Sequence, residues 1–370
     1  MSEKTSRRHF LLGRTLAPTV EHVIQGTGLI GDLWPDSREA EIPSTGSDWP
    51  LMKIGRPAMA CEFEVSLNRG EYPQGIEAAM AALDEIERLE NRLSVFRPGS
   101  EVCDLNAAAG KQPVQVSGEL FSLLSRCQEF SRMTDGAVDV TSSPLWRLWG
   151  FSRRSGKIPA SDEITRTRQY VGWRHLTLDD SARTVAFERP GMEISFGCAG
   201  KGFALDSASE QLEEAGIGNY LFHGGLSSIL ARGTRFPSEK NNGWTVGIAD
   251  PVRPGRRLAE IRLCNEALGT SGSQSQFFYH KGRRYPHIID PRTGFPADKA
   301  LMVTVAAPHA ATADMLSTAF FVAGPEKAEE YCHAHPGTAA FFVLPEDRKN
   351  GVRLQHFGFR EGRLFLRPPE

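Results

Sequence analysis

The chain has 370 residues, of which 40% are hydrophobic and 24% charged, a composition typical of a globular protein. Its formal net charge of −2 and the absence of a Lys/Arg run argue against a nucleic-acid partner. The six cysteines are scattered without a CxxC pair, which indicates small buried side chains and no zinc site or disulfide framework. No apolar run reaches the ~20 residues that cross a bilayer, so we expect no transmembrane segment.

Residues 1–50 lack hydrophobic periodicity and are rich in Pro, Ser, Gly and Asp, which predicts a leader or tether. Ser6–Leu12, SRRHFLL, resembles the start of a twin-arginine export signal. The segment that follows is interrupted by Arg14, Glu21 and His22 and has no small-residue cleavage site. The signal would therefore be degenerate, and both a cytoplasmic and an exported location stay open.

One domain, residues 51–365, is expected to follow this leader. Alternating apolar residues predict a half-buried strand over Met59–Leu67. Apolar residues three or four apart then predict a helix over residues 76–89. FRPGSEVCDLN, residues 96–106, is expected to form a Pro-Gly turn and a short polar segment. Ser117 is expected to cap the next helix.

The rest of the domain mixes strands and helices. Gly136 is expected to lead into a strand, and residues 185–196, VAFERPGMEISF, to form a hairpin. Two strands are predicted on either side of the Gly-Gly pair in residues 219–233, with helices at Gly200–Gly216 and His309–Gly324. Separate hairpins and helices indicate an α+β fold with mixed or antiparallel sheets and packed helices, not a regular βαβ winding.

A glycine-rich segment, SFGCAGKGFALD, spans Ser195–Asp206 at a predicted strand-to-helix junction. Its three glycines around Lys201 would let the backbone approach a ligand closely. The free N–H groups at the helix start favour an anion such as a phosphate. By itself the segment is better explained as a glycine-softened turn with an exposed lysine.

Asp314 and Thr318 are four residues apart in a predicted helix, so their side chains project from one face. Such an oxygen pair suits Mg²⁺, which keeps water ligands and shares substrate phosphates. The alternative is that Asp314 serves only as a partner of the helix dipole.

ALGTSGSQSQFF, residues 267–278, is expected to be a hydroxyl-rich turn before an aromatic strand. Thr270, Ser271 and Ser273 would hydrogen-bond phosphates there, or else only cap the turn.

His287 precedes a rigid turn that contains Asp290, Pro291 and Gly294. A histidine beside a carboxylate is the minimum requirement for a general base oriented by its neighbour. A hairpin end with solvated polar side chains explains the same residues equally well.

Seven segments carry a combined pattern between about Met59 and Gly324. In chain order they are FRPGSEVCDLN, DGAVDVTSSPLWRLWG, ISFGCAGKGFALD, GWTVGIADP, ALGTSGS, HIIDPRTGFP and ADMLSTAFFVAG. Together they resemble the FAD:protein FMN transferase family, the ApbE-like flavin transferases. The resemblance implies an ApbE-like, T-fold-related architecture over the predicted domain.

The resemblance also implies an enzyme that moves FMN from FAD to a Thr or Ser hydroxyl of a target protein with Mg²⁺, releasing AMP. The target would be a flavinylated redox-complex subunit or an FMN-binding domain. Two alternatives stay open. One is an FAD pyrophosphatase, in which water replaces the protein hydroxyl, and the other is a non-catalytic flavin-binding protein.

Carried over by position, the resemblance implies specific roles for residues of the four polar segments. His287, with Asp290 nearby, would supply the catalytic base. The metal would be held by Asp314, Thr318, the backbone carbonyl of Cys198 and the position of Ser317. FAD contacts would come from Met59, Phe96, Ala137, Val138, Asp139, Ser195, Lys201 and Ile289, together with the hydroxyls of Thr270 and Ser271.

Several positions depart from the family pattern. Phe96 replaces a frequent tyrosine, Ser195 a usual aspartate, and Ser317 an acidic residue of some members. After Met59, Ala60 and Cys61 stand where Gly-Thr is familiar. With fewer carboxylates, we expect the metal to bind tightly only when FAD phosphates complete its ligand shell.

Overall fold

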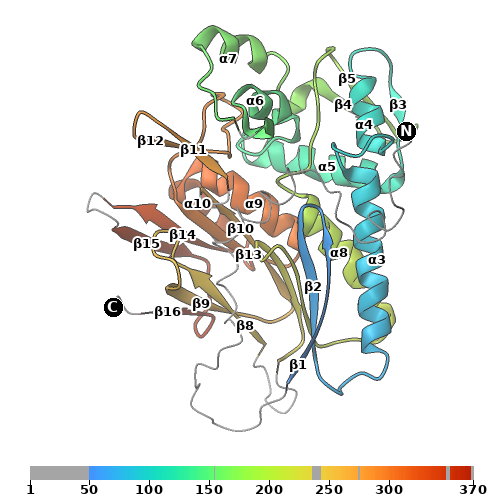
Figure 1. Cartoon of the computed structure of the whole chain (residues 1–370), viewed down its shortest axis with the longest axis vertical. Helices are drawn as coiled ribbons and strands as arrows, with labels where there is room; N and C mark the ends of the chain where they lie inside the picture. Colours follow the sequence, from blue (N-terminus) through green and yellow to red (C-terminus); the bar gives the residue numbers. More distant parts are fainter. Residues whose placement is uncertain (1–49, 154, 236–242, 274–275, 347–350, 368–370) are drawn as a thin grey trace, which may run out of the picture.

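The computed structural model describes residues 50–153, 155–235, 243–273, 276–346 and 351–367. Its centre is an eight-stranded sheet in which all neighbouring strands are antiparallel, in the order β1-β2-β6-β7-β10-β13-β14-β15 (Figure 1). These strands are β1 (Leu51–Ala58), β2 (Cys61–Asn68), β6 (Tyr220–Gly224), β7 (Ser228–Arg232), β10 (Glu266–Gly272), β13 (Met302–Ala307), β14 (Ala339–Pro345) and β15 (Val352–Phe357).

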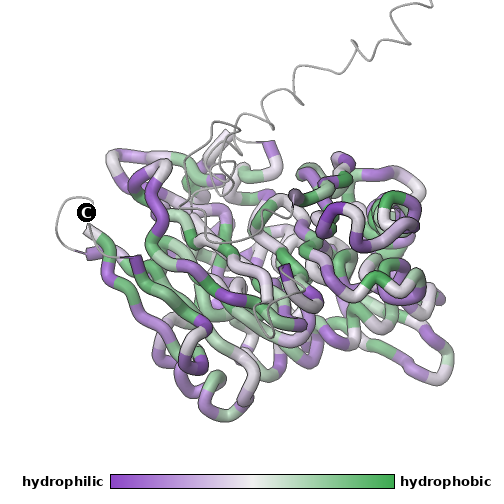
Figure 2. The backbone as a smooth tube through the Cα atoms, turned by 90° about the horizontal axis from the view of Figure 1, so that it is seen from below, coloured by the Kyte–Doolittle hydropathy of each residue, from purple (hydrophilic) through white to green (hydrophobic). Residues whose placement is uncertain are grey.

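Helices cover one face of this sheet, and a three-stranded sheet in the order β16-β9-β8 covers part of the other. On β7, Leu230 packs into the helix-side core, whereas Ile229 and Ala231 pack toward the small sheet. Apolar side chains thus lie on both faces of the central strands, where Figure 2 shows much of the hydrophobic colouring. The small sheet consists of β8 (Trp244–Ala249), β9 (Arg257–Leu263) and β16 (Leu364–Leu366).

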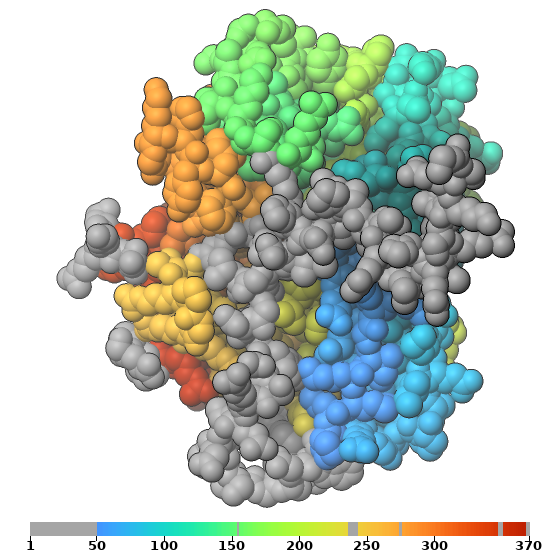
Figure 3. Space-filling model, viewed as in Figure 1, coloured from blue at the N-terminus to red at the C-terminus, as the bar shows by residue number. Residues whose placement is uncertain are grey.

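The remaining elements complete the helical layer and the upper end of the molecule in Figure 1. The helices are α3 (Gly75–Leu93), α4 (Glu101–Ala107), α5 (Gly118–Met133), α6 (Ser143–Leu148), α7 (Ser161–Arg168), α8 (Gly200–Glu214), α9 (Ala310–Ala323) and α10 (Pro325–Ala334). The remaining strands are β3 (Val114–Gln115), β4 (Leu176–Asp179), β5 (Thr184–Phe187), β11 (Phe277–His280) and β12 (Arg283–Pro286). Figure 3 shows the α6–α7 segment packed beside the β11–β12 hairpin, and a small core of Trp149, Phe151 and Ile164 joins them.

Helix α9 is held very close to its neighbours by two glycines. A Cβ on Gly202 of α8 would lie 2.3 Å from the Ala310 carbonyl oxygen, and one on Gly269 of β10 would lie 2.3 Å from the Ala313 carbonyl carbon. The Asp206 carboxylate of α8 also accepts hydrogen bonds from the first N–H groups of α9, those of Ala310 (2.8 Å) and Ala311 (2.9 Å). Asp206 therefore caps α9 from a neighbouring helix, since the N-cap residue itself supplies no side-chain bond.

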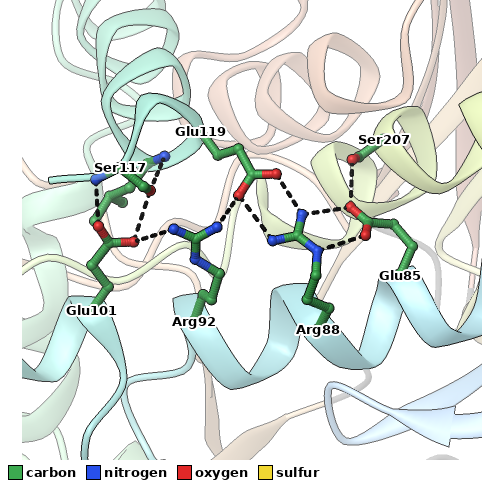
Figure 4. Close-up of polar contacts among 8 residues, drawn as sticks. Glu85, Arg88, Arg92, Glu101, Ser117, Glu119 and Ser207 are labelled. Carbon is green, nitrogen blue, oxygen red and sulfur yellow. Dashed lines mark hydrogen bonds and ion pairs between the residues drawn. The ribbon is translucent and has the colours of Figure 1, made fainter.

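The solvent side of α3 carries a ladder of ion pairs that reaches two other helices (Figure 4). Arg88 pairs with Glu85 (2.7 Å) and Glu119, and Arg92 pairs with Glu119 and Glu101 (3.4 Å). We refer to these five residues as the α3 ladder. The ladder ties α3 to α4 and α5 through side chains that are partly exposed.

Many predicted elements are confirmed. Ser117 accepts a hydrogen bond from the Leu120 N–H at the start of α5. The strands around the Gly-Gly pair are β6 and β7, and the two predicted helices are α8 and α9. No described helix is long and apolar enough to cross a membrane. The predicted leader and export signal lie almost entirely outside the described residues.

Four predictions were wrong. The supposed polar segment after Phe96 contains α4, which Ser100 caps by accepting from the Cys103 N–H. After Gly136 comes a 3₁₀ turn, because the Asp139 carboxylate binds the Thr141 N–H. The hairpin predicted at 185–196 does not form; β5 ends before Pro190, which has no N–H to donate, and pairs with β4 and β3. The hydroxyls of Thr270 and Ser271 project from strand β10 and not from a turn.

Candidate functional site

One cavity of about 1530 Å³ collects most of the residues predicted to act together. Its walls come from the β1–β2 turn, the α8 start, β10, α9 and the segment after β12. Thirteen predicted residues line it: Met59, Phe96, Ala137, Val138, Asp139, Ser195, Cys198, Lys201, Thr270, Ser271, His287, Ile289 and Thr318. The other three, Asp290, Asp314 and Ser317, do not line it. Asp290 and Ser317 adjoin lining residues in the sequence, and Asp314 hydrogen-bonds to Gly202 and Ser228, which adjoin the lining residues Lys201 and Ser227.

Lys201 supplies a positive charge to the site from the first turn of α8. Its Nζ donates to the Ser227 hydroxyl, which lies in the turn between β6 and β7. That turn is strained, since Leu226 has a φ of 60°. Because Ser227 is a neutral partner, the ammonium charge of Lys201 is not cancelled by this contact.

Asp314 is a buried carboxylate at the site, with only 8% of its surface exposed. Its Oδ2 accepts from the Gly202 N–H (2.8 Å), and the Ser228 hydroxyl lies 2.8 Å from both oxygens. Burial raises the pKa of Asp314 to about 6, although the nearby Lys201 charge opposes the shift. Neutral donors therefore hold this carboxylate in place without neutralising it.

Three hydroxyls join α9 to β10 next to this carboxylate. Ser271 Oγ lies 2.8 Å from Ser317 Oγ and 3.0 Å from Thr318 Oγ1. Ser317 also donates to the Asp314 carbonyl oxygen (2.9 Å). The sequence predicted Ser317 and Thr318 near Asp314, whereas the contact with Ser271 depends on the β10–α9 packing.

The predicted metal ligands form an oxygen-only set, which suits Mg²⁺ in kind. Asp314 contributes one carboxylate, Thr318 and Ser317 contribute hydroxyls, and Cys198 contributes its backbone carbonyl. Among the described residues there is no group of three or more His, Cys, Asp or Glu side chains that could hold a metal ion. The residues therefore fit a cation whose shell is completed by water and by substrate oxygens.

His287 is held in one tautomer by the backbone. Its Nδ1 lies 3.0 Å from the Gln276 carbonyl oxygen, which can only accept, so Nδ1 carries the proton and Nε2 keeps its lone pair. Burial lowers the pKa of His287 to about 4, and the Lys201 charge adds to this shift. At neutral pH, His287 is thus an uncharged imidazole on the cavity wall.

Asp290 does not contact the imidazole. Its carboxylate forms a two-fold ion pair with Arg292 (2.9 Å for each bond), and its carbonyl accepts from the Gly294 N–H (2.8 Å). The predicted sharp turn is present, with a φ of 80° at Gly294. Asp290 therefore shapes the turn that carries His287, and the carbonyl of Gln276, not Asp290, orients the ring.

The side of the cavity predicted to bind flavin combines a hydrogen-bonded buried carboxylate with an exposed aromatic ring. The buried Asp139 carboxylate accepts from Thr141 (2.9 and 2.7 Å) and from the Trp173 N–H (2.8 Å), while burial raises its pKa. Phe96 is 76% exposed, so its ring face is free to stack on an aromatic ligand. Met59 and Ala60 both have positive φ at the β1–β2 turn.

Sequence reasoning missed Ser227, Ser228 and Asp206. The serines follow the Gly-Gly pair after one residue, Leu226, and that pattern could have drawn attention to them. Their partners, Lys201 and Asp314, are far away in the sequence, so only the strand order reveals the contacts.

Comparison with known proteins gives a consistent result. The family model described as "ApbE family" matches residues 59–342. An FAD:protein FMN transferase of Treponema pallidum is 32% identical over 286 residues, covering 72% of this chain and 78% of that protein. One of Haemophilus influenzae is 30% identical over 264 residues, with coverages of 69% and 75%. The crystal structure of the ApbE protein of Thermotoga maritima superposes with a TM-score of 0.74 at 28% identity, covering 83% of this chain and 97% of that one. The expected ApbE-like α+β architecture is confirmed.

Proposed function

Because this chain belongs to the ApbE family, we propose that it is an FAD:protein FMN transferase. In the proposed reaction, a Thr or Ser hydroxyl of a target protein attacks the FMN phosphorus of FAD. A new P–O bond forms, the diphosphate P–O bond breaks, AMP leaves, and the hydroxyl proton is released. The observation that carries this proposal is that Lys201, Thr318, a neutral His287 and the predicted flavin residues line one cavity.

His287 is the base of the proposed reaction. Its Nε2 has a free lone pair because Nδ1 donates to Gln276, and its lowered pKa of about 4 keeps it unprotonated at neutral pH. It would take the proton from the incoming hydroxyl and return it to solvent after AMP departs. The fixed tautomer means that no ring rotation is needed before proton transfer.

Lys201 and the start of α8 bind the diphosphate in this scheme. The positive end of the α8 dipole and the ammonium group of Lys201 favour a polyanion at the same place. The Ser227 contact holds Nζ in position while leaving it charged. These groups would stabilise the negative charge that develops on the leaving AMP.

Mg²⁺ is part of the proposal. When bound, it would neutralise the diphosphate charge. Asp314, Ser317, Thr318 and the Cys198 carbonyl would hold it. The carboxylate of Asp314 is already oriented by Gly202 and Ser228, so little rearrangement of this side chain is required.

The target would be a flavinylated redox-complex subunit or an FMN-binding domain. The decisive experiment is incubation of the enzyme with FAD and Mg²⁺, with and without a purified domain of this kind, followed by mass spectrometry of the domain and chromatography of the nucleotides. We expect the domain to gain the mass of FMN while AMP is released. Free FMN without any labelled domain would instead establish a pyrophosphatase, and intact FAD would establish a binding protein.

A further inference from the structure

Among the strands that the structure describes, β8 is an edge strand whose one partner is β9. It pairs with β9 from Trp244↔Leu263 to Ala249↔Arg257, and it ends the order β16-β9-β8. Within the part of the chain that the structure describes, no backbone group outside β9 hydrogen-bonds to the backbone of residues 244–249. Alternate residues of such a strand point their N–H and C=O groups away from the sheet. With respect to the described residues, β8 thus offers a row of unpaired donors and acceptors.

This free edge faces the cavity that holds the proposed active site. Val246–Pro251 line the cavity without a gap in the sequence. Side chains of a strand alternate between its two faces, so an uninterrupted run of lining residues means that the backbone edge itself borders the space. Figure 1 shows β8 on the side of the small sheet toward β1 and β2, whose connecting turn forms another wall of the cavity.

The β8 end of the cavity has no role in the predicted binding of FAD. None of the residues expected to contact flavin or metal lies on β8, and its neighbours on the wall are apolar, among them Ile229 and Leu268. The volume of about 1530 Å³ also exceeds the roughly 300–1,000 Å³ of ordinary small-molecule sites. Leu268 lines the β8 end of the cavity, and Thr270 lines the end predicted to bind FAD. Both residues belong to strand β10, so the two ends form one continuous space.

We propose that an extended segment of the acceptor protein binds as an additional strand along the free edge of β8. This inference rests on the proposed function, which requires an acceptor hydroxyl inside this cavity. Backbone N–H and C=O groups of the segment would pair with those of β8, and alternate small or apolar side chains would contact the apolar wall. The modified Thr or Ser would then lie toward Lys201 and His287.

Two proline variants test the pairing, Val246→Pro and Gly247→Pro. Successive strand residues alternate, so one proline removes an N–H that binds β9 and the other removes an N–H of the free edge. The free-edge variant is identified by a melting temperature close to that of the unmodified enzyme. For this variant we expect the KM for a purified acceptor domain to rise at least about 10-fold, which corresponds to about 1.4 kcal/mol, while the KM for FAD stays unchanged.

Leu366→Pro is the matched control, because β16 is the opposite edge of the same small sheet and does not line the cavity. Its KM for the acceptor is expected to stay within about twofold of the unmodified value. An unchanged acceptor KM in the free-edge variant overturns the inference. So does a parallel rise in the KM for FAD, because the β8 end would then belong to the nucleotide. Failure of the unmodified enzyme to label any acceptor would count against the proposed function itself.

Amide hydrogen exchange of the unmodified, FAD-loaded enzyme gives a second measurement if the proline variants do not fold. We expect alternate amides of residues 244–249 to exchange quickly without the acceptor domain and to become protected when it is added. Unchanged exchange overturns the inference. Protection already present without the acceptor also overturns it, since another part of this chain, or a second copy if protection depends on concentration, would then occupy the edge.

Discussion

Two groups of charged side chains in this molecule are stabilised in opposite ways. In the α3 ladder, each guanidinium contacts carboxylates (Figure 4), and the side chains of Arg88, Arg92 and Glu119 are 36–41% exposed. Around the cavity, Asp314 and Lys201 are held by hydroxyl and backbone N–H groups that carry no charge. The ladder pairs two arginines directly with three glutamates, whereas the charges at the cavity have neutral hydrogen-bond partners and stay available to a ligand.

This difference separates structural charge from functional charge. A carboxylate already paired with arginine has little attraction left for a cation or a phosphate-bound metal. A buried carboxylate whose partners are neutral donors is not neutralised by them, and its burial costs desolvation free energy. Groups with pKa values shifted in this way concentrate at functional sites. Removing charges from the two regions should therefore affect different measurements, and the following variants are ordered by the size of the expected effect.

His287→Ala should have the largest effect. Loss of a general base typically lowers the rate by about 10²–10⁴-fold, and we expect this loss in the transfer rate with FAD binding preserved. Equilibrium dialysis of FAD and single-turnover kinetics separate these quantities. A variant that transfers FMN at the unmodified rate would remove His287 from the mechanism.

The pH dependence of the unmodified enzyme sharpens the same prediction. The folded-state pKa of His287 is lowered to about 4 from an ordinary value of 6.5 because burial disfavours the imidazolium. The base therefore stays neutral until the pH falls toward 4. An acid limb of kcat/KM near pH 6 would belong to Asp314, whose pKa is raised to about 6, and protonation of His287 should add a second loss of activity near pH 4. Since the unfolded chain binds this proton more readily, His287 contributes stability that falls as the pH drops from about 6.5 to 4.

Asp314→Asn is expected to lower the transfer rate by about 100-fold, or about 2.7 kcal/mol of transition-state stabilisation. Asparagine has nearly the same shape and can accept the Gly202 and Ser228 hydrogen bonds, but it lacks the charge. Calorimetry with Mg²⁺ in the presence of FAD should show weaker metal binding. Mg²⁺ binding as tight as in the unmodified enzyme would contradict the assignment of Asp314 as a ligand.

Asp206→Ala removes the cap that α8 provides for α9. Loss of a helix cap costs about 0.5–2 kcal/mol of stability, and displacement of α9 should also lower the transfer rate by about 10-fold. Asp206→Asn keeps one accepting oxygen for two N–H donors, so it should restore part of both losses. Urea unfolding and transfer kinetics measure them. Equal kinetics in all three proteins would show that Asp206 serves stability alone.

Arg92→Met in the α3 ladder should have the smallest effect. Arg92 forms partly exposed ion pairs with Glu119 and Glu101, and salt screens such pairs. Together they contribute at most about 1 kcal/mol to the free energy of unfolding. The transfer rate should stay within about twofold. If this variant impaired catalysis as strongly as Asp314→Asn, the distinction between the two groups of charges would fail.

Local patterns in the sequence predicted helices α3, α5, α8 and α9 and strands β2, β6 and β7, because hydrophobic period, caps and Gly breaks are encoded within a few neighbouring residues. Ser117 and the Gly-Gly pair between β6 and β7 are examples. The errors came where a side chain overrides local preference, as with the carboxylate of Asp139, which turns the chain after Gly136 into a 3₁₀ turn.

The residues of the candidate site were predictable in identity but not in their contacts. The order of the motifs identified Lys201, His287 and Asp314 as residues of one site. The groups that orient their side chains, however, belong to strands and loops distant in the sequence. Gln276 fixes the tautomer of His287, and Ser228 holds Asp314 across 86 residues of sequence. Such partners carry no local signal, since an ordinary glutamine carbonyl or serine hydroxyl becomes specific only through the fold.

The position of β8 has a consequence for how this protein behaves at high concentration. Exposed strand edges are templates on which identical chains assemble into aggregates. A second folded copy of the protein cannot easily reach a strand edge that borders an internal cavity. A single extended, locally unfolded segment can still enter the cavity. The same recess would thus discourage self-assembly and require any modified substrate to present its hydroxyl on a segment detached from its own folded body.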